Sequence, residues 1–87
     1  MTYSILFQSR VEKDLKPLPK TILLRVFRKI ITLQDNPIPQ TAVKLSGVDN
    51  LFRVRVGDYR IVYETVHDKT LVIIHYVRHR RDVYRSL

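Results

Sequence analysis

The chain has 87 residues, 45% of them hydrophobic and 28% charged, with 16 Lys and Arg against 8 Asp and Glu. A chain of this length supports one modest core, so we expect a single domain over residues 1–87. It has no cysteine, which excludes disulfides and thiolate chemistry. No apolar stretch approaches the roughly 20 residues of a membrane helix. The formal charge of +8 favours a polyanion, an acidic protein or an anionic surface as partner, and a cytoplasmic location is expected.

The first half of the chain predicts one strand and two helices. Residues 3–7 are typical of a short strand, and the capping-box pattern Ser9-x-x-Glu12 predicts a helix that starts at Ser9 and ends before Pro17. A longer helix is expected from about Lys20 to Gln34, because its apolar residues recur on one side. Those residues are Ile22, Leu23, Val26, Phe27, Ile30 and Leu33. The run of residues 36–39 ends this helix, and an irregular segment is expected to about residue 50.

The second half of the chain predicts three consecutive strands. Residues 51–56 alternate apolar and basic, and Gly57-Asp58 forms a two-residue hairpin loop with glycine where positive φ is needed. Residues 59–65 are predicted to form the second strand of the hairpin, residues 67–69 a turn, and residues 71–77 a third strand. The predicted fold is therefore α+β: an N-terminal strand, then two helices packed on an antiparallel sheet that ends in a three-stranded meander.

The hairpin loop fixes a register that gathers arginines on one face. Val56 should oppose Tyr59, and Arg55 should oppose Arg60. Alternation then assigns six side chains to the core face: Phe52, Val54, Val56, Tyr59, Ile61 and Tyr63. Arg53, Arg55 and Arg60 share the other face, with only Glu64 nearby to offset them. Like charges directly opposite one another destabilise a strand pair, so this face suits an anion.

The segment after the last predicted strand adds more cations. Residues 78–85 include Arg78, Arg80, Arg81 and Arg85, with His79 and Tyr84 among them. Planar guanidiniums suit phosphate, so the combination favours a phosphate-handling site. A connection symmetric about residues 67 and 68 would put His75 on the side of Arg60, and an odd loop length would reverse this.

Each of these features also has a simpler interpretation. Arginines on a strand are usually a solvated face, a histidine such as His75 is usually structural, and Arg25, Arg28 and Lys29 fit the wet side of the second helix. No Gly-rich phosphate loop, paired carboxylates or metal-ligand spacing occurs in the sequence, so neither a cofactor nor a metal is expected.

Three segments of the chain resemble the RelE-type toxins of bacterial toxin–antitoxin systems, in the RelE/ParE superfamily. They are residues 44–47, 51–64 and 77–84, and the resemblance extends over nearly the whole chain. It implies a microbial-ribonuclease-like (RelE) fold and a ribosome-dependent mRNA endoribonuclease that cuts in the 30S A site. It also implies a RelB-like antitoxin that wraps the toxin, which is expected to be monomeric alone and hetero-oligomeric with its antitoxin.

The resemblance also implies roles for individual residues. Arg53 and Arg55 match strand residues that contact RNA phosphate, and Arg60, Arg80 and Tyr84 match the catalytic positions. Arg81 and Lys44 are expected to contact phosphate as well, and His79 is a weaker catalytic candidate. The family often has Lys at positions 53 and 55, and the Arg found here keeps the charge without being able to transfer a proton. Residues 37–48 hold no acidic side chain, so the glutamate–histidine pair of some relatives is not expected.

The implied reaction is attack of an RNA 2′-OH on the adjacent phosphate, giving a 2′,3′-cyclic phosphate and a 5′-OH without a metal. Arg60 and Arg80 would stabilise the phosphorane, and Tyr84 would act as general base or stack on a base. Three other functions stay open: a ParE-like toxin that inhibits DNA gyrase, a basic nucleic-acid-binding module, and a toxin that only binds its antitoxin.

Overall fold

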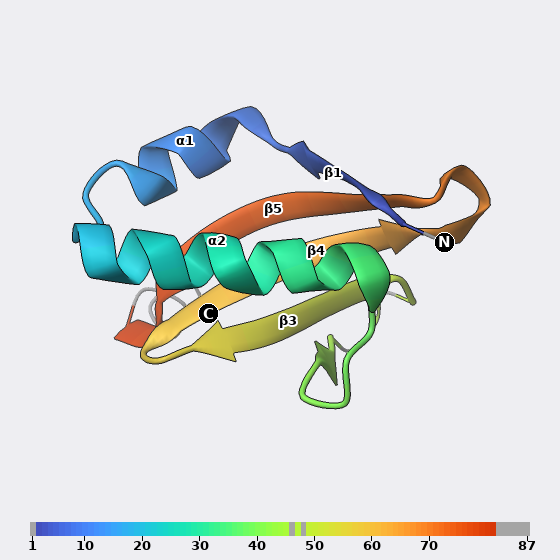
Figure 1. Cartoon of the computed structure of the whole chain (residues 1–87). Helices are drawn as coiled ribbons and strands as arrows, with labels where there is room; N and C mark the ends of the chain where they lie inside the picture. The colour runs from blue at the N-terminus through green and yellow to red at the C-terminus, as the bar shows by residue number, and fades with distance from the viewer. Residues whose placement is uncertain (1, 46, 48, 82–87) are drawn as a thin grey trace.

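The computed structural model of the protein describes residues 2–45, 47 and 49–81 (Figure 1). In chain order the elements are β1 (Ser4–Phe7), α1 (Ser9–Leu15), α2 (Lys20–Asp35), β2 (Val43–Lys44), β3 (Leu51–Val56), β4 (Tyr59–Val66), a 3-10 turn (His67–Lys69) and β5 (Leu71–His79). The predicted α+β class, the two helices and the closing meander are confirmed. Strand β2 lies in the segment that was predicted to be irregular.

The sheet of the described residues has five strands in the order β1-β5-β4-β3-β2. Neighbours from β2 to β5 run antiparallel, and this was predicted for β3, β4 and β5. Strand β1 instead runs parallel to β5, with Ser4 beside Leu71 and Phe7 beside Ile74. A parallel pair needs a long crossover, and the helices and the meander between the two strands supply it. The sheet is therefore mixed, and the first strand lies beside the last.

Helices α1 and α2 cover one face of this sheet (Figure 1). Helix α2 contributes Val26, Ile30 and Leu33 of its predicted stripe, whereas Phe27 stays 36% exposed at the stripe's margin. The buried hydrophobic cluster consists of Val11, Val26, Ile30, Leu33, Phe52, Val54, Val56, Ile61, Tyr63, Val72, Ile74 and Val77. Every predicted core residue of the hairpin belongs to it except Tyr59, which is half-buried at the end of the sheet.

Helix α1 starts without the predicted capping box. Ser9 is already its first residue, and the N-cap is Gln8, which makes no side-chain capping bond. The reason lies in the sheet, because the Gln8 N–H donates to the carbonyl of Ile74 on β5 at 3.0 Å. Pairing with β5 holds Gln8 extended (φ −65°, ψ 148°), so the chain passes directly from strand to helix.

The β3–β4 hairpin has the predicted register, with Val56 opposite Tyr59 and Arg55 opposite Arg60, and Gly57 has a φ of +57°. The register of β5 differs from the symmetric pairing, because Arg60 lies opposite Arg78. Two features shift it. The connection is a 3-10 turn that ends at Thr70 in a left-handed conformation, and a β-bulge interrupts the pairing between Val62 and Tyr63.

Candidate functional site

Three arginines occupy adjacent register positions on the sheet face opposite the helices. Arg55 on β3 lies opposite Arg60 on β4, and Arg60 lies opposite Arg78 on β5. We call this set the arginine row. Arg60 is only 9% exposed, so its guanidinium is held in a partly dehydrated position. Three cations in neighbouring positions concentrate positive potential, and their planar donor forks match phosphate oxygens.

A second row runs beside the first. It consists of Arg53 on β3, Val62 on β4 and Tyr76 on β5, and Val62 is 3% exposed. The Tyr76 ring contacts two guanidiniums, those of Arg10 and Arg78, with Cζ atoms 5.2 Å and 4.9 Å from the ring centroid. Cation–π contacts of this kind restrict where a guanidinium can lie. Tyr76 therefore helps to position Arg78 within the arginine row.

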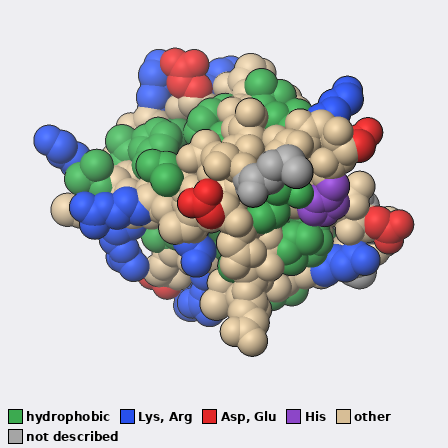
Figure 2. All heavy atoms as spheres, turned by 45° about the vertical axis from the view of Figure 1, so that its right-hand side comes forward, with side chains coloured by type: hydrophobic (Ala, Val, Ile, Leu, Met, Phe, Trp, Pro, Cys, Tyr) green, Lys and Arg blue, Asp and Glu red, His purple; other side chains and the backbone are tan. Residues whose placement is uncertain are grey.

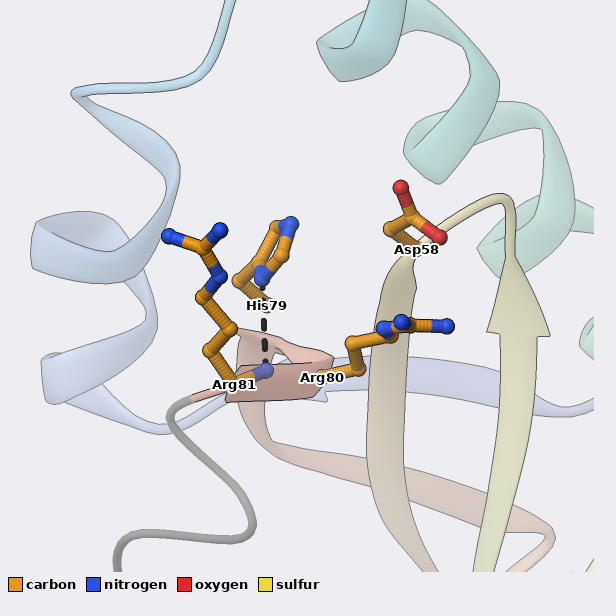
Figure 3. A pocket seen from close by; sticks show the side chains of 4 residues that line it. All are labelled: Asp58, His79, Arg80 and Arg81. Carbon is orange, nitrogen blue, oxygen red and sulfur yellow. Dashed lines mark hydrogen bonds between the residues drawn. The ribbon is translucent and has the colours of Figure 1, made fainter.

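An open hollow lies where β5 ends, and Asp58, His79, Arg80 and Arg81 line it (Figure 3). The Arg80 N–H donates to the carbonyl of Asp58 at 2.8 Å, which ties the first residue after β5 to the hairpin loop. Figure 3 shows Arg80 extending beneath Asp58, while Arg81 lies on the other side of the hollow, near His79. Arg80 thus comes from the end of the strand that carries Arg78.

His79 lies on a different side of the sheet from the arginine row. It pairs with Tyr59, whose side chain faces the helix side, and the two rings meet edge to face at 5.2 Å. The backbone N–H of Arg81 donates to His79 Nδ1 at 3.2 Å. A neutral imidazole that accepts at Nδ1 carries its proton on Nε2. In this geometry His79 is a hydrogen-bond donor toward the hollow.

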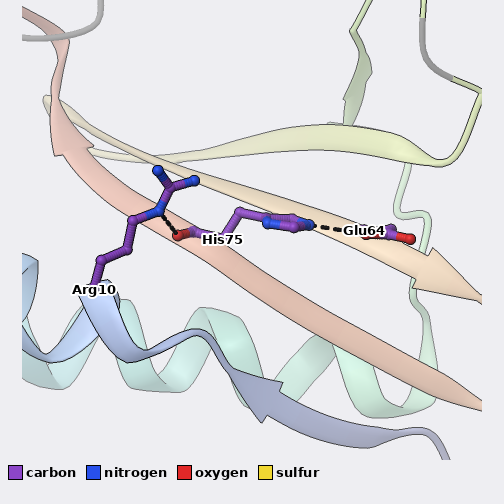
Figure 4. A network of polar contacts seen from close by, with 3 residues as sticks. All are labelled: Arg10, Glu64 and His75. Atoms are coloured by element: carbon purple, nitrogen blue, oxygen red, sulfur yellow. Dashed lines mark hydrogen bonds and ion pairs between the residues drawn. The ribbon is translucent and has the colours of Figure 1, made fainter.

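Glu64 and His75 form a hydrogen-bonded pair on the same face as the arginines (Figure 4). His75 Nε2 lies 2.9 Å from Glu64 Oε1. Glu64 had been expected to offset the arginines, but its described partner is this imidazole. Glu64 follows Arg60 by four residues along β4, which is about 13 Å in an extended strand. The pair is therefore remote from the arginine row.

Helix α1 closes the edge of β5 where β1 ends. Arg10 Nε donates to the His75 carbonyl at 2.9 Å (Figure 4), and the Val77 N–H donates to Asp14 Oδ2 at 3.1 Å. Asp14 Oδ1 also lies 3.9 Å from Arg78 Nε. This arrangement could not be predicted, because an Arg and an Asp four residues apart normally indicate a solvent-exposed helix pair.

The other predicted site residues do not all lie on the face of the arginine row. Lys44 on β2 pairs with Phe52 and so lies on the helix side, where its Nζ is 3.7 Å from Asp49 Oδ1. Arg81 is exposed at the hollow, and Tyr84 lies outside the described residues. The structure thus brings Arg53, Arg55 and Arg60 onto one face with Arg78, whereas Arg80 lies just after β5 in the hollow that His79 also lines.

Within residues 2–45, 47 and 49–81, no group of three or more His, Asp and Glu side chains is placed to hold a metal ion. None of the helices in this part of the chain is long and apolar enough to cross a membrane. The chemistry of the site rests on fixed cations, a neutral imidazole and hydrogen-bond donors. Such groups bind and stabilise negative charge.

Comparisons with known proteins found relatives over nearly the full length of this chain. The family described as the ParE toxin of the type II toxin–antitoxin system parDE matches residues 5–84. A putative toxin RelE1 of Methanocaldococcus jannaschii is 35% identical over 89 residues, which is 99% of each chain. The mRNA interferase toxin RelE of Escherichia coli is 27% identical, over 97% of this chain and 92% of that protein. The archaeal RelE–RelB complex of Pyrococcus horikoshii contains a chain with a TM-score of 0.82 and 30% identity, matched over 92% of this chain and 97% of that one.

Proposed function

The chain belongs to the RelE/ParE family of type II toxin–antitoxin toxins, and on this basis we propose that it is an endoribonuclease. Its substrate is mRNA in the ribosomal A site, and cleavage there inhibits translation. The observation that carries the proposal is the arginine row, which Arg80 continues at the end of β5. A relative with matching length is named an mRNA interferase, which supports the same activity.

The proposed reaction is an internal displacement at phosphorus. The 2′-oxygen attacks the adjacent phosphate, the bond from phosphorus to O5′ breaks, and the products are a 2′,3′-cyclic phosphate and a 5′-OH. Arg60 and Arg80 stabilise the charge that develops on the phosphorane oxygens. Arg60 is suited to this role because it is only 9% exposed, and a cation in a site with little water stabilises developing negative charge strongly. Arg53, Arg55, Arg81 and, from the helix side, Lys44 contact neighbouring phosphates.

Two proton transfers complete the reaction. A general base takes the proton of the 2′-OH, and an acid returns a proton to the O5′ leaving group. Arginine cannot serve as the base because it stays protonated, so Tyr84 is our candidate. His79 is the weaker candidate, because its Nδ1 already accepts a hydrogen bond from Arg81 and only the protonated Nε2 faces outward. Positioning of the mRNA by the ribosome would compensate for a base of ordinary reactivity.

The proposed partners are the ribosome with its mRNA and a cognate antitoxin. The solved relatives from Pyrococcus horikoshii and Methanococcus jannaschii are complexes of RelE with RelB. On α2 the side chains of Leu24, Phe27 and Ile31 are 49%, 36% and 59% exposed, and basic Lys20 and Arg28 lie on the same helix. Figure 2 shows hydrophobic side chains at the surface, with Lys, Arg, Asp and Glu side chains among them. An acidic antitoxin helix with an apolar stripe fits such a surface.

The experiment that tests the nuclease is primer extension on mRNA from cells that express the protein. The wild type should produce cuts in register with codons. Arg80→Ala and Tyr84→Phe should each lower this cutting by about 100-fold or more, the size of effect seen when one group that stabilises a transition state is removed. Lys69→Ala, which removes a cation from the far turn, should cut like the wild type. Full cutting by both site variants would refute the residue assignment, provided that circular dichroism shows them folded.

A ParE-like gyrase inhibitor is the second candidate, because the family description that matches residues 5–84 is that of a ParE toxin. Such a toxin acts by binding, so it requires no set of phosphate-stabilising arginines. A supercoiling assay with purified gyrase separates the two functions. Inhibited supercoiling without mRNA cuts would favour this candidate, and cuts without inhibition would favour the nuclease.

A further inference from the structure

Helix α2 and strand β3 together form a strongly basic depression. Arg25, Arg28 and Lys29 of α2 line one open hollow with Arg55 of β3. A second hollow beside it is lined by Lys29, Arg55 and Arg53. The two hollows share Lys29 and Arg55, so they form one continuous surface, which we call the α2–β3 groove. The described lining contains five cations and no carboxylate.

The topology explains why these cations meet. Strand β2 pairs with β3 only at Arg53 and Phe52, so the edge of β3 near the hairpin loop has no neighbouring strand among the described residues. Arg55 lies at this edge. Helix α2 passes over the hairpin, and a Cβ built on Gly57 would lie 3.6 Å from Arg25 Nη1. One side of α2 is thereby brought against the edge of β3.

The α2 cations were expected to be only the wet side of a helix, but their surroundings differ from those of an ordinary solvated face. Surface cations are usually interspersed with acidic residues, which offset their repulsion. Here the described lining gathers cations from two elements, and Arg53 connects the groove to the sheet face that carries the arginine row. A polyanion bound along this surface would replace repulsion between the cations by attraction to phosphates.

We propose that the α2–β3 groove binds the sugar–phosphate backbone of RNA, at a place separate from the phosphate that reacts. The inference rests on the proposed function for the identity of the polyanion. The lining favours RNA over an acidic protein, because its apolar residues among those that the structure describes are just Val43 and Val56. Interfaces between proteins need an apolar centre, whereas nucleic-acid interfaces are polar and positively charged. The apolar surface of α2 lies elsewhere on the helix, at Leu24, Phe27 and Ile31.

The test compares two triple variants of equal net charge. Arg25→Gln/Arg28→Gln/Lys29→Gln removes the α2 cations of the groove, and Lys13→Gln/Lys16→Gln/Lys69→Gln removes three exposed cations elsewhere. Binding of a short single-stranded RNA is measured over a range of salt concentrations. Each lost phosphate contact lowers the slope of log affinity against log salt concentration by about 0.7. The slope of the groove variant should therefore be smaller by about 2, and this variant should bind at least 10-fold more weakly at low salt. The control variant should stay within about twofold of the wild type.

A second measurement separates this inference from the proposed function. In cells, the groove variant should need more protein than the wild type to produce cuts, and those cuts should fall at the same codon positions. RNA binding that depends on the groove, together with no mRNA cleavage by the wild type, would refute the nuclease and leave the groove supported. Equal losses of RNA binding in both triple variants would overturn the inference. Unchanged RNA binding with lost antitoxin binding would also overturn it, because the groove would then be a protein interface.

Discussion

Tyr63 shows how one buried hydroxyl ties the sheet to the segment after α2. Its side chain is completely buried, it stacks on Phe52 at a centroid distance of 5.9 Å, and its hydroxyl donates to the Pro37 carbonyl at 2.8 Å. Burial disfavours the charged phenolate and raises the pKa of Tyr63 to about 12. In the unfolded chain this pKa is about 10, so the folded state holds the phenolic proton more tightly.

This difference predicts a loss of stability at alkaline pH. A group whose pKa is raised by folding stabilises the protein fully below its unfolded pKa, and the contribution is lost as the pH rises from about 10 to about 12. The free energies of unfolding of the wild type and of Tyr63→Phe, measured in urea, should therefore approach each other as the pH rises. At pH 8 the variant should be less stable by about 1 kcal/mol, because Pro37 loses its donor. By pH 11 the gap should shrink by about 1 kcal/mol, and a constant gap would contradict the prediction.

Single residues of the site were predictable where a short loop fixed their position. Arg55 and Arg60 are neighbours because a two-residue loop permits only one register, and that register was read correctly. Arg78 was not recognised as their neighbour, because neither the bulge at Val62 nor the left-handed Thr70 has a sequence signature. Arg10 was missed for another reason. It approaches the sheet from a helix, and the distance along the chain conceals the contact.

At the scale of elements, α1 completes an edge that the sheet leaves open. Strand β1 pairs with β5 only as far as Ile74. Beyond that point, the Arg10 side chain donates to the His75 carbonyl and the Val77 N–H donates to the Asp14 carboxylate. An exposed strand edge invites pairing with another chain, and a helix across the edge prevents it. Side chains of the short helix α1 thus form the hydrogen bonds that a neighbouring strand would otherwise form with this edge of β5.

Asp14 provides a direct test of this role. Asp14→Ala removes the acceptor of the Val77 N–H and should destabilise the protein by about 1–3 kcal/mol in urea unfolding. Asp14→Asn keeps an oxygen acceptor and loses only a long ion pair with the partly exposed Arg78, which is worth about 1 kcal/mol or less. An Asn variant as unstable as the Ala variant would show that charge, and not the hydrogen bond, is what matters.

The elements themselves were mostly predictable, and their partners were less so. The spacing of apolar residues located α2 and the three meander strands, because buried residues recur with the period of the element. Helix α1 was located by the Ser9-x-x-Glu12 pattern and Pro17, although no capping bond forms at its start. The parallel pairing of β1 was not visible, since any exposed edge of the sheet would have suited a short apolar strand. Strand β2 was missed because its two residues are too few to show a period.

At the scale of the whole molecule, α2 serves two surfaces at once. One part of the helix carries the cations of the α2–β3 groove, and another exposes Leu24, Phe27 and Ile31. The proposed functions of these surfaces differ, because we propose that the cations bind RNA and that the apolar side chains bind the antitoxin. The two surfaces should therefore be separable by mutation.

Leu24→Ser/Ile31→Ser tests the antitoxin surface. Both side chains are about half-exposed, so the effect on stability should be small, within about 1 kcal/mol. Cells that express this variant together with its proposed antitoxin should stop growing, because the antitoxin can no longer bind the toxin. Leu6→Ser/Ile38→Ser is a matched control, since those residues are 49% and 43% exposed and lie off both α2 and the α2–β3 groove. Continued growth of cells with the α2 variant, at wild-type toxin levels, would exclude this surface.

The pairing of β1 with β5 also affects the order of events during synthesis. Residues 4–7 have no strand partner until residues 71–74 exist, and Arg60 has no neighbour on its β5 side until Arg78 has been made. Contacts between residues this far apart in sequence form slowly, and chains are built from the N-terminus. A partly synthesised chain therefore lacks the face that the proposed reaction uses. The proposed attack on mRNA is therefore possible only after residue 78 has been made.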